Sequence, residues 1–408
     1  MKQRNRYMRS VIAFVLVLAI TGCSANNSDK VVSTSDMTSH TQEEREDVVA
    51  TFHYDNFASK QKWKYGVLLG DGQILSFDTP LYCTDMAAGV SSPLCEVEGC
   101  THNTSDCQAI FDEHYGCDFV YCYNEKLYAA SVLSNCIRIT CAGANESTHE
   151  VIAYDVLEGD IHLSGYYVYE DKLYIGASVE DANIELLQEG DGSYKTYMYP
   201  SIYRFDFATG ELDLVYCDEK GDYGTMLEIL YANENLLYFD YGESNGMRMA
   251  LDVAKEMVTE VEGYDDGYYL GCQKEMDYYA VSDENGYQTG EVIAFDREGN
   301  RKSQIQLKNL PKDESVHCDI HLLENGFVVN EQSVEEETGT MTFYDRNGKK
   351  IDVVEDCSYY VIGEHQGFYL LGENTYSGVA FAYAKMEDVK LTDSKERNRR
   401  MIELHPWE

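Results

Sequence analysis

The sequence is poor in several residue types, and each shortage narrows what the protein can be. Of 408 residues only 5 are proline and 2 are tryptophan, and 32 basic residues stand against 72 acidic ones. A formal net charge of −40 repels nucleic acid, so we expect no nucleic-acid partner. Long amphipathic helical patterns are absent after the N-terminal region, which directs the fold class away from helices.

Motifs of common catalytic sites are also missing. The chain has no Gly-x-Ser-x-Gly elbow, no His-Glu-x-x-His pair and no glycine-rich phosphate loop. His317 and Cys318 are adjacent, and neighbouring residues of a strand point to opposite faces, so they do not favour a nucleophile pair. The sequence therefore leans away from an enzyme, while a site assembled from distant acids stays open.

Only one apolar run stands out, and it is short. It covers 13 residues from Ser10 to Gly22, fewer than the roughly 20 that a membrane-spanning helix needs. Four basic residues precede it, namely Lys2, Arg4, Arg6 and Arg9. This layout predicts a secretory signal peptide over residues 1–22, with a signal anchor as the alternative.

The end of this run, Ile20-Thr-Gly-Cys23, resembles a bacterial lipobox. The resemblance implies cleavage before Cys23, acylation of Cys23, and a protein held at the extracytoplasmic face of the cell membrane. Residues 23–50 are rich in Ser, Asn, Thr, Asp and Glu, which predicts a flexible linker. Without the four basic residues of the signal peptide, the chain carries a net charge of −44.

A repeated turn pattern runs through residues 51–391, the predicted folded domain. An apolar strand ends in Asp, and Gly follows within three or four residues, as Asp can close a turn and Gly supplies positive φ. The leading aspartates are spaced by 70, 51, 46, 44 and 49 residues, with a degenerate copy at Asp252. They are Asp85, Asp155, Asp206, Asp252, Asp296 and Asp345.

A second pattern accompanies each unit: a polar turn leads directly into an aromatic or apolar doublet. The doublets are Leu127-Tyr128, Leu173-Tyr174, Leu237-Tyr238, Tyr278-Tyr279, Phe327-Val328 and Phe368-Tyr369. Short strands in units of 40–50 residues predict an all-β fold, a β-propeller of four-stranded blades. A partial first unit near residues 63–94 makes seven blades the favoured number, with six or eight open and a pair of β-sandwiches as the alternative fold.

Two stretches resemble known protein families. The segment Leu173-Tyr-Ile and the later Ile202-Tyr-Arg-Phe-Asp-Phe-Ala-Thr-Gly210 resemble units of TolB-like propellers. The stretch from Leu94 to Cys107 resembles a Cys/His signature in propeller lipoproteins of clostridial-type Gram-positive bacteria, a family of unknown function. The resemblance implies a propeller over most of residues 51–391. Glu98 departs from it, since the related sequences often have proline there.

The cysteines offer the sharpest candidate site. Twelve of the 13 remain after Cys23, and eight of these fall within residues 83–141. An exported protein favours disulfides, so Cys95, Cys100, His102 and Cys107 predict either a disulfide-stapled loop or a tetrahedral zinc site. Three thiols and one imidazole would fill the zinc shell and leave no open position, so such a metal would be structural.

Four more cysteines, Cys117, Cys122, Cys136 and Cys141, invite a pairing of the outer two and the inner two. A strand over Leu127–Leu133 would lie between such partners, and buried free thiols are the alternative. Acidic turns at 191–193, 265–267 and 283–286 could hold calcium, although ordinary solvated turns account for them. No cofactor is firmly implied.

The final segment, residues 392–408, reverses the charge trend with Lys395, Arg397, Arg399 and Arg400. We expect a short helix or strand that docks on the acidic propeller. The favoured function is a lipid-anchored binding module for a protein, peptide or glycan. The alternatives are a surface enzyme of the glycoside lyase or hydrolase type, and a Cys/His metal or redox module.

Overall fold

The computed structural model describes most of the chain after the N-terminal region. Residues 1–65 and 405–408, which include the signal peptide, Cys23 and the linker, lie outside the described residues. Between 66 and 404 the residues not described are 70–71, 77–79, 96, 105, 112–116, 125, 144–149, 189–193, 234, 243–247, 262–266, 284–286, 297–298, 309, 311–315, 334–337 and 376–377.

Seven sheets follow one another along the chain, and each is an antiparallel blade of four main strands. The first three blades are β1 (Gly66–Leu68), β2 (Gln73–Ser76), β3 (Tyr82–Asp85), β4 (Val90–Pro93); β5 (Phe119–Tyr123), β6 (Lys126–Leu133), β7 (Cys136–Gly143), β8 (Glu150–Val156); and β9 (Ile161–Tyr169), β10 (Lys172–Glu180), β13 (Tyr197–Asp206), β14 (Leu212–Cys217). Blade 3 also carries the hairpin β11 (Leu187–Gln188) and β12 (Tyr194–Lys195), and β15 (Asp222–Tyr223) on β13.

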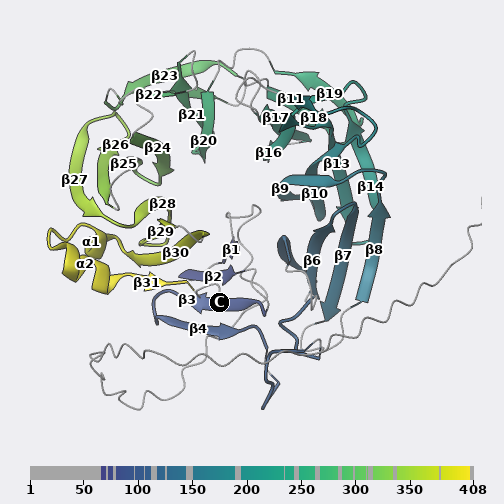
Figure 1. The fold of residues 1–408 in the computed structure, drawn as a ribbon, viewed down its shortest axis with the longest axis horizontal. Helices are drawn as coiled ribbons and strands as arrows, with labels where there is room; N and C mark the ends of the chain where they lie inside the picture. Colours follow the sequence, from purple (N-terminus) through teal and green to yellow (C-terminus); the bar gives the residue numbers. More distant parts are fainter. Residues whose placement is uncertain are drawn as a thin grey trace, which may run out of the picture. The chain divides into compact units, whose positions relative to one another are not determined.

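The other four blades follow the same plan. Their strands are β16 (Met226–Asn233), β17 (Leu236–Gly242), β18 (Arg248–Asp252), β19 (Met257–Glu260); β20 (Gly267–Gln273), β21 (Met276–Ser282), β22 (Gln288–Asp296), β23 (Arg301–Gln306); β24 (Val316–Leu323), β25 (Gly326–Ser333), β26 (Gly339–Asp345), β27 (Lys350–Cys357); and β28 (Tyr360–His365), β29 (Phe368–Thr375), β30 (Gly378–Lys385), β31 (Ile402–Glu403). The labelled first strands lie toward the centre and the fourth strands at the rim (Figure 1). The predicted all-β propeller with seven four-stranded blades is confirmed.

Both repeated sequence patterns have a fixed place in the blade. The apolar doublets lie within the first four residues of the second strand, in β6, β10, β17, β21, β25 and β29. The aspartates end the third strand in five blades, at Asp85, Asp206, Asp252, Asp296 and Asp345. Asp155 is the exception, because it lies within the outermost strand β8, opposite Ile137.

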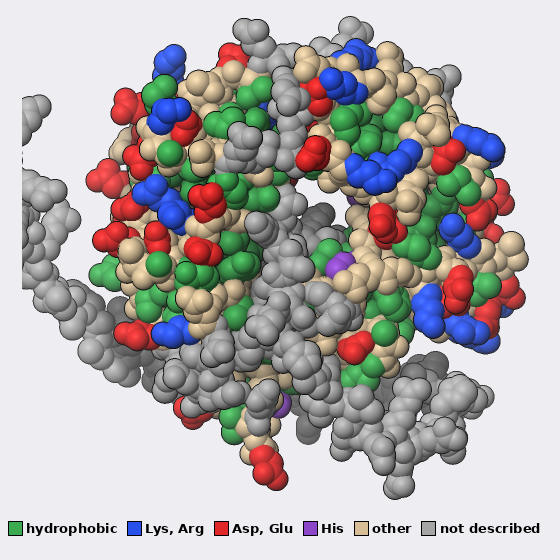
Figure 2. Space-filling view, turned by 180° about the vertical axis from the view of Figure 1, so that it is seen from behind, with side chains coloured by type: hydrophobic (Ala, Val, Ile, Leu, Met, Phe, Trp, Pro, Cys, Tyr) green, Lys and Arg blue, Asp and Glu red, His purple; other side chains and the backbone are tan. Residues whose placement is uncertain are grey.

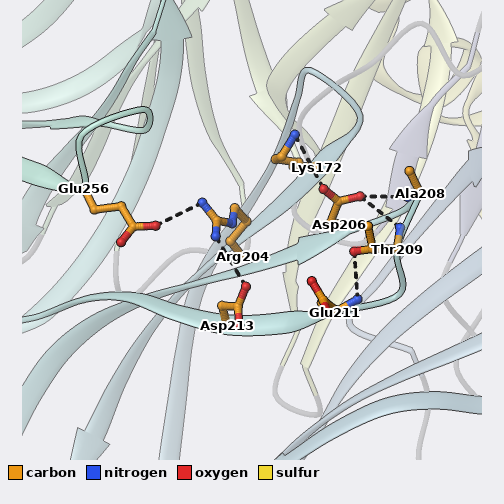
Figure 3. Close-up of polar contacts among 8 residues, drawn as sticks. All are labelled: Lys172, Arg204, Asp206, Ala208, Thr209, Glu211, Asp213 and Glu256. Carbon is orange, nitrogen blue, oxygen red and sulfur yellow. Dashed lines mark hydrogen bonds and ion pairs between the residues drawn. The ribbon is translucent and has the colours of Figure 1, made fainter.

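The turn after Asp206 shows why the pattern repeats (Figure 3). Its Oδ1 accepts hydrogen bonds from the backbone N–H groups of Ala208, at 2.8 Å, and Thr209, at 3.2 Å. Gly210 then takes φ 75°, which favours glycine, and strand β14 begins. The aspartate therefore satisfies turn donors that no strand partner reaches.

Side chains packed between neighbouring blades form the core. Blade 1 meets blade 7 through a cluster that contains Ile74, Phe368 and Tyr383, and His365 Nε2 lies 2.7 Å from the carbonyl oxygen of Leu69. Blade 3 meets blade 4 at the rim, where Arg204 pairs with Glu256 at 3.3 Å (Figure 3). The first and last blades thus close the ring through the packing of this cluster and the contact between His365 and Leu69.

The C-terminal segment completes blade 7. After β30 come α1 (Met386–Val389) and α2 (Ser394–Arg400), and then β31, which pairs with β30. Residues 392–403 are therefore part of the last blade, so the propeller continues past residue 391, where the sequence placed its end. Among the described residues, none of the helices combines the length and the apolar character that crossing a bilayer requires.

Candidate functional site

Four potential metal ligands meet in the connection between β4 and β5. The ligand atoms of Cys95, Cys100, His102 and Cys107 all lie within 4.8 Å of one another. Cys107 is fully buried, whereas the other three are half-buried. The residues that the sequence singled out as one constellation are brought together by the fold.

Two tight turns place these side chains. The N–H of Cys100 donates to the carbonyl oxygen of Val97 at 3.1 Å, and Gly99 between them has φ 75°. His102 adopts φ 53°, a left-handed conformation that is uncommon for a residue with a Cβ. A second turn bonds the N–H of Cys107 to the carbonyl oxygen of Thr104 at 2.9 Å. The chain thus reverses twice, and each reversal turns a ligand toward the same point.

The thiols in the centre have different electrostatic surroundings. Burial raises the pKa of Cys107 to about 12. The pKa of Cys100 is lowered, first by a hydrogen bond from the backbone of His102. His102 Nδ1 lies 3.3 Å from the sulfur of Cys107. A cation at this point would favour the thiolate form of the buried sulfur, because metal binding deprotonates a coordinating thiol.

The donor set decides which metal the centre fits. Three sulfurs and one imidazole nitrogen suit Zn²⁺ or another soft cation, because thiolates are preferred by such ions. Calcium takes oxygen ligands, so it does not fit these residues. Of the acidic turns considered for calcium, 191–193, 265–266 and 284–286 lie outside the described residues. The described structure therefore supports a metal-binding cluster only at the Cys/His centre.

The other clustered cysteines lie in blade 2 and its approach. Strand β6 pairs with both β5 and β7, so it separates the inner pair Cys122 and Cys136, as expected for a strand over residues 127–133. Cys122 lies opposite Leu127 and Cys136 opposite Leu133, at opposite ends of β6. The twelve described cysteines form no disulfide. Cys117, Cys122 and Cys141 pack against the same apolar cluster as the Cys/His centre.

A second group of polar side chains lies on the innermost strands of blades 4, 5 and 6. Glu228, Tyr268 and Asp319 are each paired with the fifth residue of the neighbouring second strand. Because the register is equivalent, the three lie at the same level of the propeller. Tyr268 is 53% exposed, the Asp319 side chain is 45% exposed, and Glu228 is also exposed.

Exposure at this level is combined with nearby protein atoms. Glu228 is reached by solvent, yet surrounding protein atoms still raise its pKa through desolvation. The space-filling view shows a central hollow with acidic side chains and a histidine at its edge (Figure 2). His317, two residues before Asp319, lies 2.9 Å from it through Nε2, and this hydrogen bond raises the pKa of His317.

A buried charged cluster between blades 4 and 5 lies behind Glu228. Arg248 Nη1 lies 3.0 Å from Asp277 Oδ2, and both side chains are fully buried. The Tyr231 hydroxyl donates to the same carboxylate oxygen at 2.7 Å. Four tyrosine rings lie 5.1–5.9 Å from the guanidinium carbon of Arg248, those of Tyr231, Tyr238, Tyr269 and Tyr279. Sequence reasoning missed this cluster, because its members are spread over 49 residues without a common spacing.

Comparisons with known proteins extend to the fold alone. No known family profile matches the chain, and no curated protein matches it. Among solved structures, prolyl oligopeptidase B from Galerina marginata has 11% identity and a TM-score of 0.48 over 86% of this chain and 51% of its own. This chain thus spans about half of that peptidase. The pattern shared with TolB-like propellers stays a resemblance.

Two further solved structures have a comparably low similarity to this chain. A protein called YjhT has 10% identity and a TM-score of 0.39, over 70% of this chain and 96% of its own. An oligogalacturonate lyase in complex with manganese has 10% identity and a TM-score of 0.38, over 65% and 72%. At these TM-scores the propeller assignment rests on the strand pairing of the protein itself.

Proposed function

We propose that the protein is a lipid-anchored, extracytoplasmic binding module, and that a positively charged peptide segment is its ligand. The observation that carries this proposal is the level formed by Glu228, Tyr268 and Asp319, exposed side chains at equivalent positions on the innermost strands of three successive blades. Function in propellers commonly resides where loops and inner strands meet such a surface.

The chemistry of this level suits a cation. The two carboxylates belong to the blades on either side of the one that carries Tyr268, and a Lys or Arg side chain can pair with a carboxylate and lie over the ring. The net charge of −40 adds a long-range field that attracts basic partners and repels polyanions. A basic protein or peptide therefore fits better than a neutral glycan, because a neutral glycan has no positive charge to pair with these carboxylates.

A binding experiment with two matched variants tests this proposal. The probe is an arginine-rich peptide, and calorimetry measures its affinity at low and at physiological salt. We expect the double variant Glu228→Gln/Asp319→Asn to weaken binding about tenfold or more, as removal of two charge-assisted contacts implies. Glu211→Gln/Glu260→Gln removes the same charge from the exposed rim and is the control.

The two variants separate a local site from a general charge effect. If both weaken the affinity equally, the peptide binds the acidic surface as a whole and the proposed level is not the site. If the inner variant alone loses affinity while the melting temperature is unchanged, the level is the binding surface. An acidic peptide of the same length should not bind at all.

One observation favours the alternative of a surface enzyme. The His317–Asp319 pair orients an imidazole at the same level, and such a pair can accept or donate a proton. A panel of neutral oligosaccharides incubated with the protein and with His317→Gln tests for a glycoside lyase or hydrolase. Product that depends on His317 would favour the enzyme over the binding module.

We further propose that the Cys/His centre holds a structural zinc ion. The closeness of its four ligand atoms and the three sulfur donors support this assignment. Four protein ligands close the shell, so the ion would fix the connection between blades 1 and 2 and would not meet a substrate.

A further inference from the structure

The sulfurs of the Cys/His centre differ in their access to solvent. Cys107 has no exposed surface and is part of the apolar cluster between blades 1 and 2, with Leu81, Leu94 and Ile110. Its sulfur accepts a hydrogen bond from the N–H of Ala109 at 3.4 Å. Cys95 and Cys100 are half-buried and only pack against this cluster. An oxidant from solvent therefore reaches Cys95 and Cys100 before Cys107.

The two accessible sulfurs also have room to approach each other. They already lie within 4.8 Å, and a disulfide requires about 2 Å between sulfur atoms. Cys95 lies two residues after the end of β4, whereas Cys100 follows an exposed turn that includes Val97 and Gly99. No heavy atom lies within 4 Å of the place where Gly99 would carry a Cβ, so the turn has space to shift.

We propose that Cys95 and Cys100 are an oxidisable pair, and that their disulfide and the bound zinc are two alternative states of one centre. This inference rests on the proposed zinc site. With Cys95 and Cys100 joined, only Cys107 and His102 remain as ligands, and two ligands do not retain a structural zinc ion. The sequence left a disulfide and a metal as alternatives for this centre. In this proposal the same protein has both states, and it holds only one of them at a time.

The oxidation is balanced with hydrogen peroxide as the oxidant. Each of the two zinc-bound thiolates loses one electron, and a sulfur–sulfur bond forms between Cys95 and Cys100. The peroxide accepts both electrons and its O–O bond breaks. With two protons from solvent, its two oxygen atoms become two water molecules. Zinc itself is not redox-active, and it leaves as Zn²⁺.

The test starts with the full chain purified under reducing conditions with zinc. Elemental analysis first gives zinc per chain. Hydrogen peroxide is then added, released zinc is followed with a chelating dye, and differential alkylation with peptide mapping locates each disulfide. We expect about one zinc per chain, one Cys95–Cys100 disulfide for each zinc released, and restoration of zinc binding by dithiothreitol.

Three variants separate the pair from the metal site. Cys107→Ser should lose zinc and still form the Cys95–Cys100 disulfide, whereas Cys95→Ser should lose both. Cys318→Ser removes a partly buried thiol in β24, away from the centre, and should change neither. Circular dichroism confirms that each variant keeps the propeller fold.

The outcomes distinguish the two proposals. Zinc release that accompanies a disulfide at Cys107, or no disulfide at all, overturns the oxidisable pair and leaves the zinc site standing. A Cys95–Cys100 disulfide in a protein that never binds zinc removes the zinc proposal and with it the two alternative states, while the assignment of the oxidisable pair holds.

Discussion

At the scale of the residue, the carboxyl group of Asp240 has a pKa well above that of an ordinary aspartate. Asp240 lies beside Arg248, with 3.7 Å between Oδ1 and Nε, and its side chain is 14% exposed. Desolvation dominates over the neighbouring guanidinium and, with Glu228 and Asp277 nearby, raises the pKa of Asp240 to about 7. The acid form of this side chain is therefore favoured in the folded protein below about pH 7.

This pKa predicts how stability depends on pH. Because the folded-state pKa lies above that of an unfolded aspartate, the contribution of Asp240 is fully present below about pH 4. It is lost as the pH rises through 7, by up to about 4 kcal/mol as an upper bound for such a shift. We expect Asp240→Asn to remove this loss, so the stability of the variant relative to the native protein should rise between pH 5 and pH 8.

Urea unfolding at both pH values measures the difference. Glu260→Gln, on the exposed strand β19, is the control, and it should leave the pH dependence of the native protein in place. Equal pH dependence in the native protein and Asp240→Asn would mean that Asp240 is already ionised at pH 5. The sequence contains no signal for this behaviour, because it depends on blade 5 covering a residue of blade 4.

At the scale of the element, α2 shows how a charged segment becomes part of a blade. Asp393 caps the helix by accepting hydrogen bonds from the N–H groups of Lys395 and Glu396. Arg397 is 1% exposed, and its guanidinium donates to the carbonyl oxygens of Leu391 and Glu355, at 3.0 and 2.8 Å, and to that of Asp356. This basic side chain thus donates hydrogen bonds to backbone carbonyl groups of blade 6 and of the residues just before the helix.

Substitution of Arg397 should therefore destabilise the protein more than substitution of its neighbours. Arg397→Gln removes a buried guanidinium that donates to three carbonyl oxygens, and we expect a loss of about 2–4 kcal/mol in the free energy of unfolding. Arg400→Gln removes an exposed pair with Glu396 and should cost less than about 0.5 kcal/mol. Guanidinium unfolding compares the two, and similar losses would show that charge alone holds the segment.

At the scale of the whole molecule, closure of the propeller ring and the proposed attachment to a membrane depend on different parts of the chain. The closure between blades 7 and 1 depends on side-chain packing and on the contact of His365 with Leu69. The proposed lipid on Cys23 would hold this ring at a membrane through the linker of residues 23–50, which lies outside the described structure. A single acyl chain binds membranes only weakly, so stable anchoring implies more than one.

The anchor can be tested without reference to the ligand. Expressed with its own leader in a Gram-positive host, the native protein should partition into detergent phase and label with a palmitate analogue. Cys23→Ser should abolish labelling and move the protein to the aqueous phase or the medium. Ser24→Ala, which leaves the cysteine in place, is the matched control. Labelling that survives Cys23→Ser would place the anchor elsewhere and contradict the lipobox resemblance.

The sequence by itself determined the propeller of four-stranded blades and favoured seven of them, and the strand pairing settled that number. The apolar doublets and the aspartate turns report local events, the entry into a second strand and the exit from a third, and each is set by residues close in the chain. The four ligands of the Cys/His centre also lie within 13 residues, so their grouping was visible before the fold was known. Asp155 and the end of the domain escaped this reasoning, since strand order and the last strand depend on long-range pairing.

Tertiary structure alone decided which distant side chains act together. The Arg248–Asp277 pair and the shared level of Glu228, Tyr268 and Asp319 arise because successive blades face one another in equivalent register. The same is true of the unequal exposure of the sulfurs, because Cys107 is covered by residues from other strands. Local patterns cannot encode these contacts, since burial and proximity between blades follow from closure of the ring.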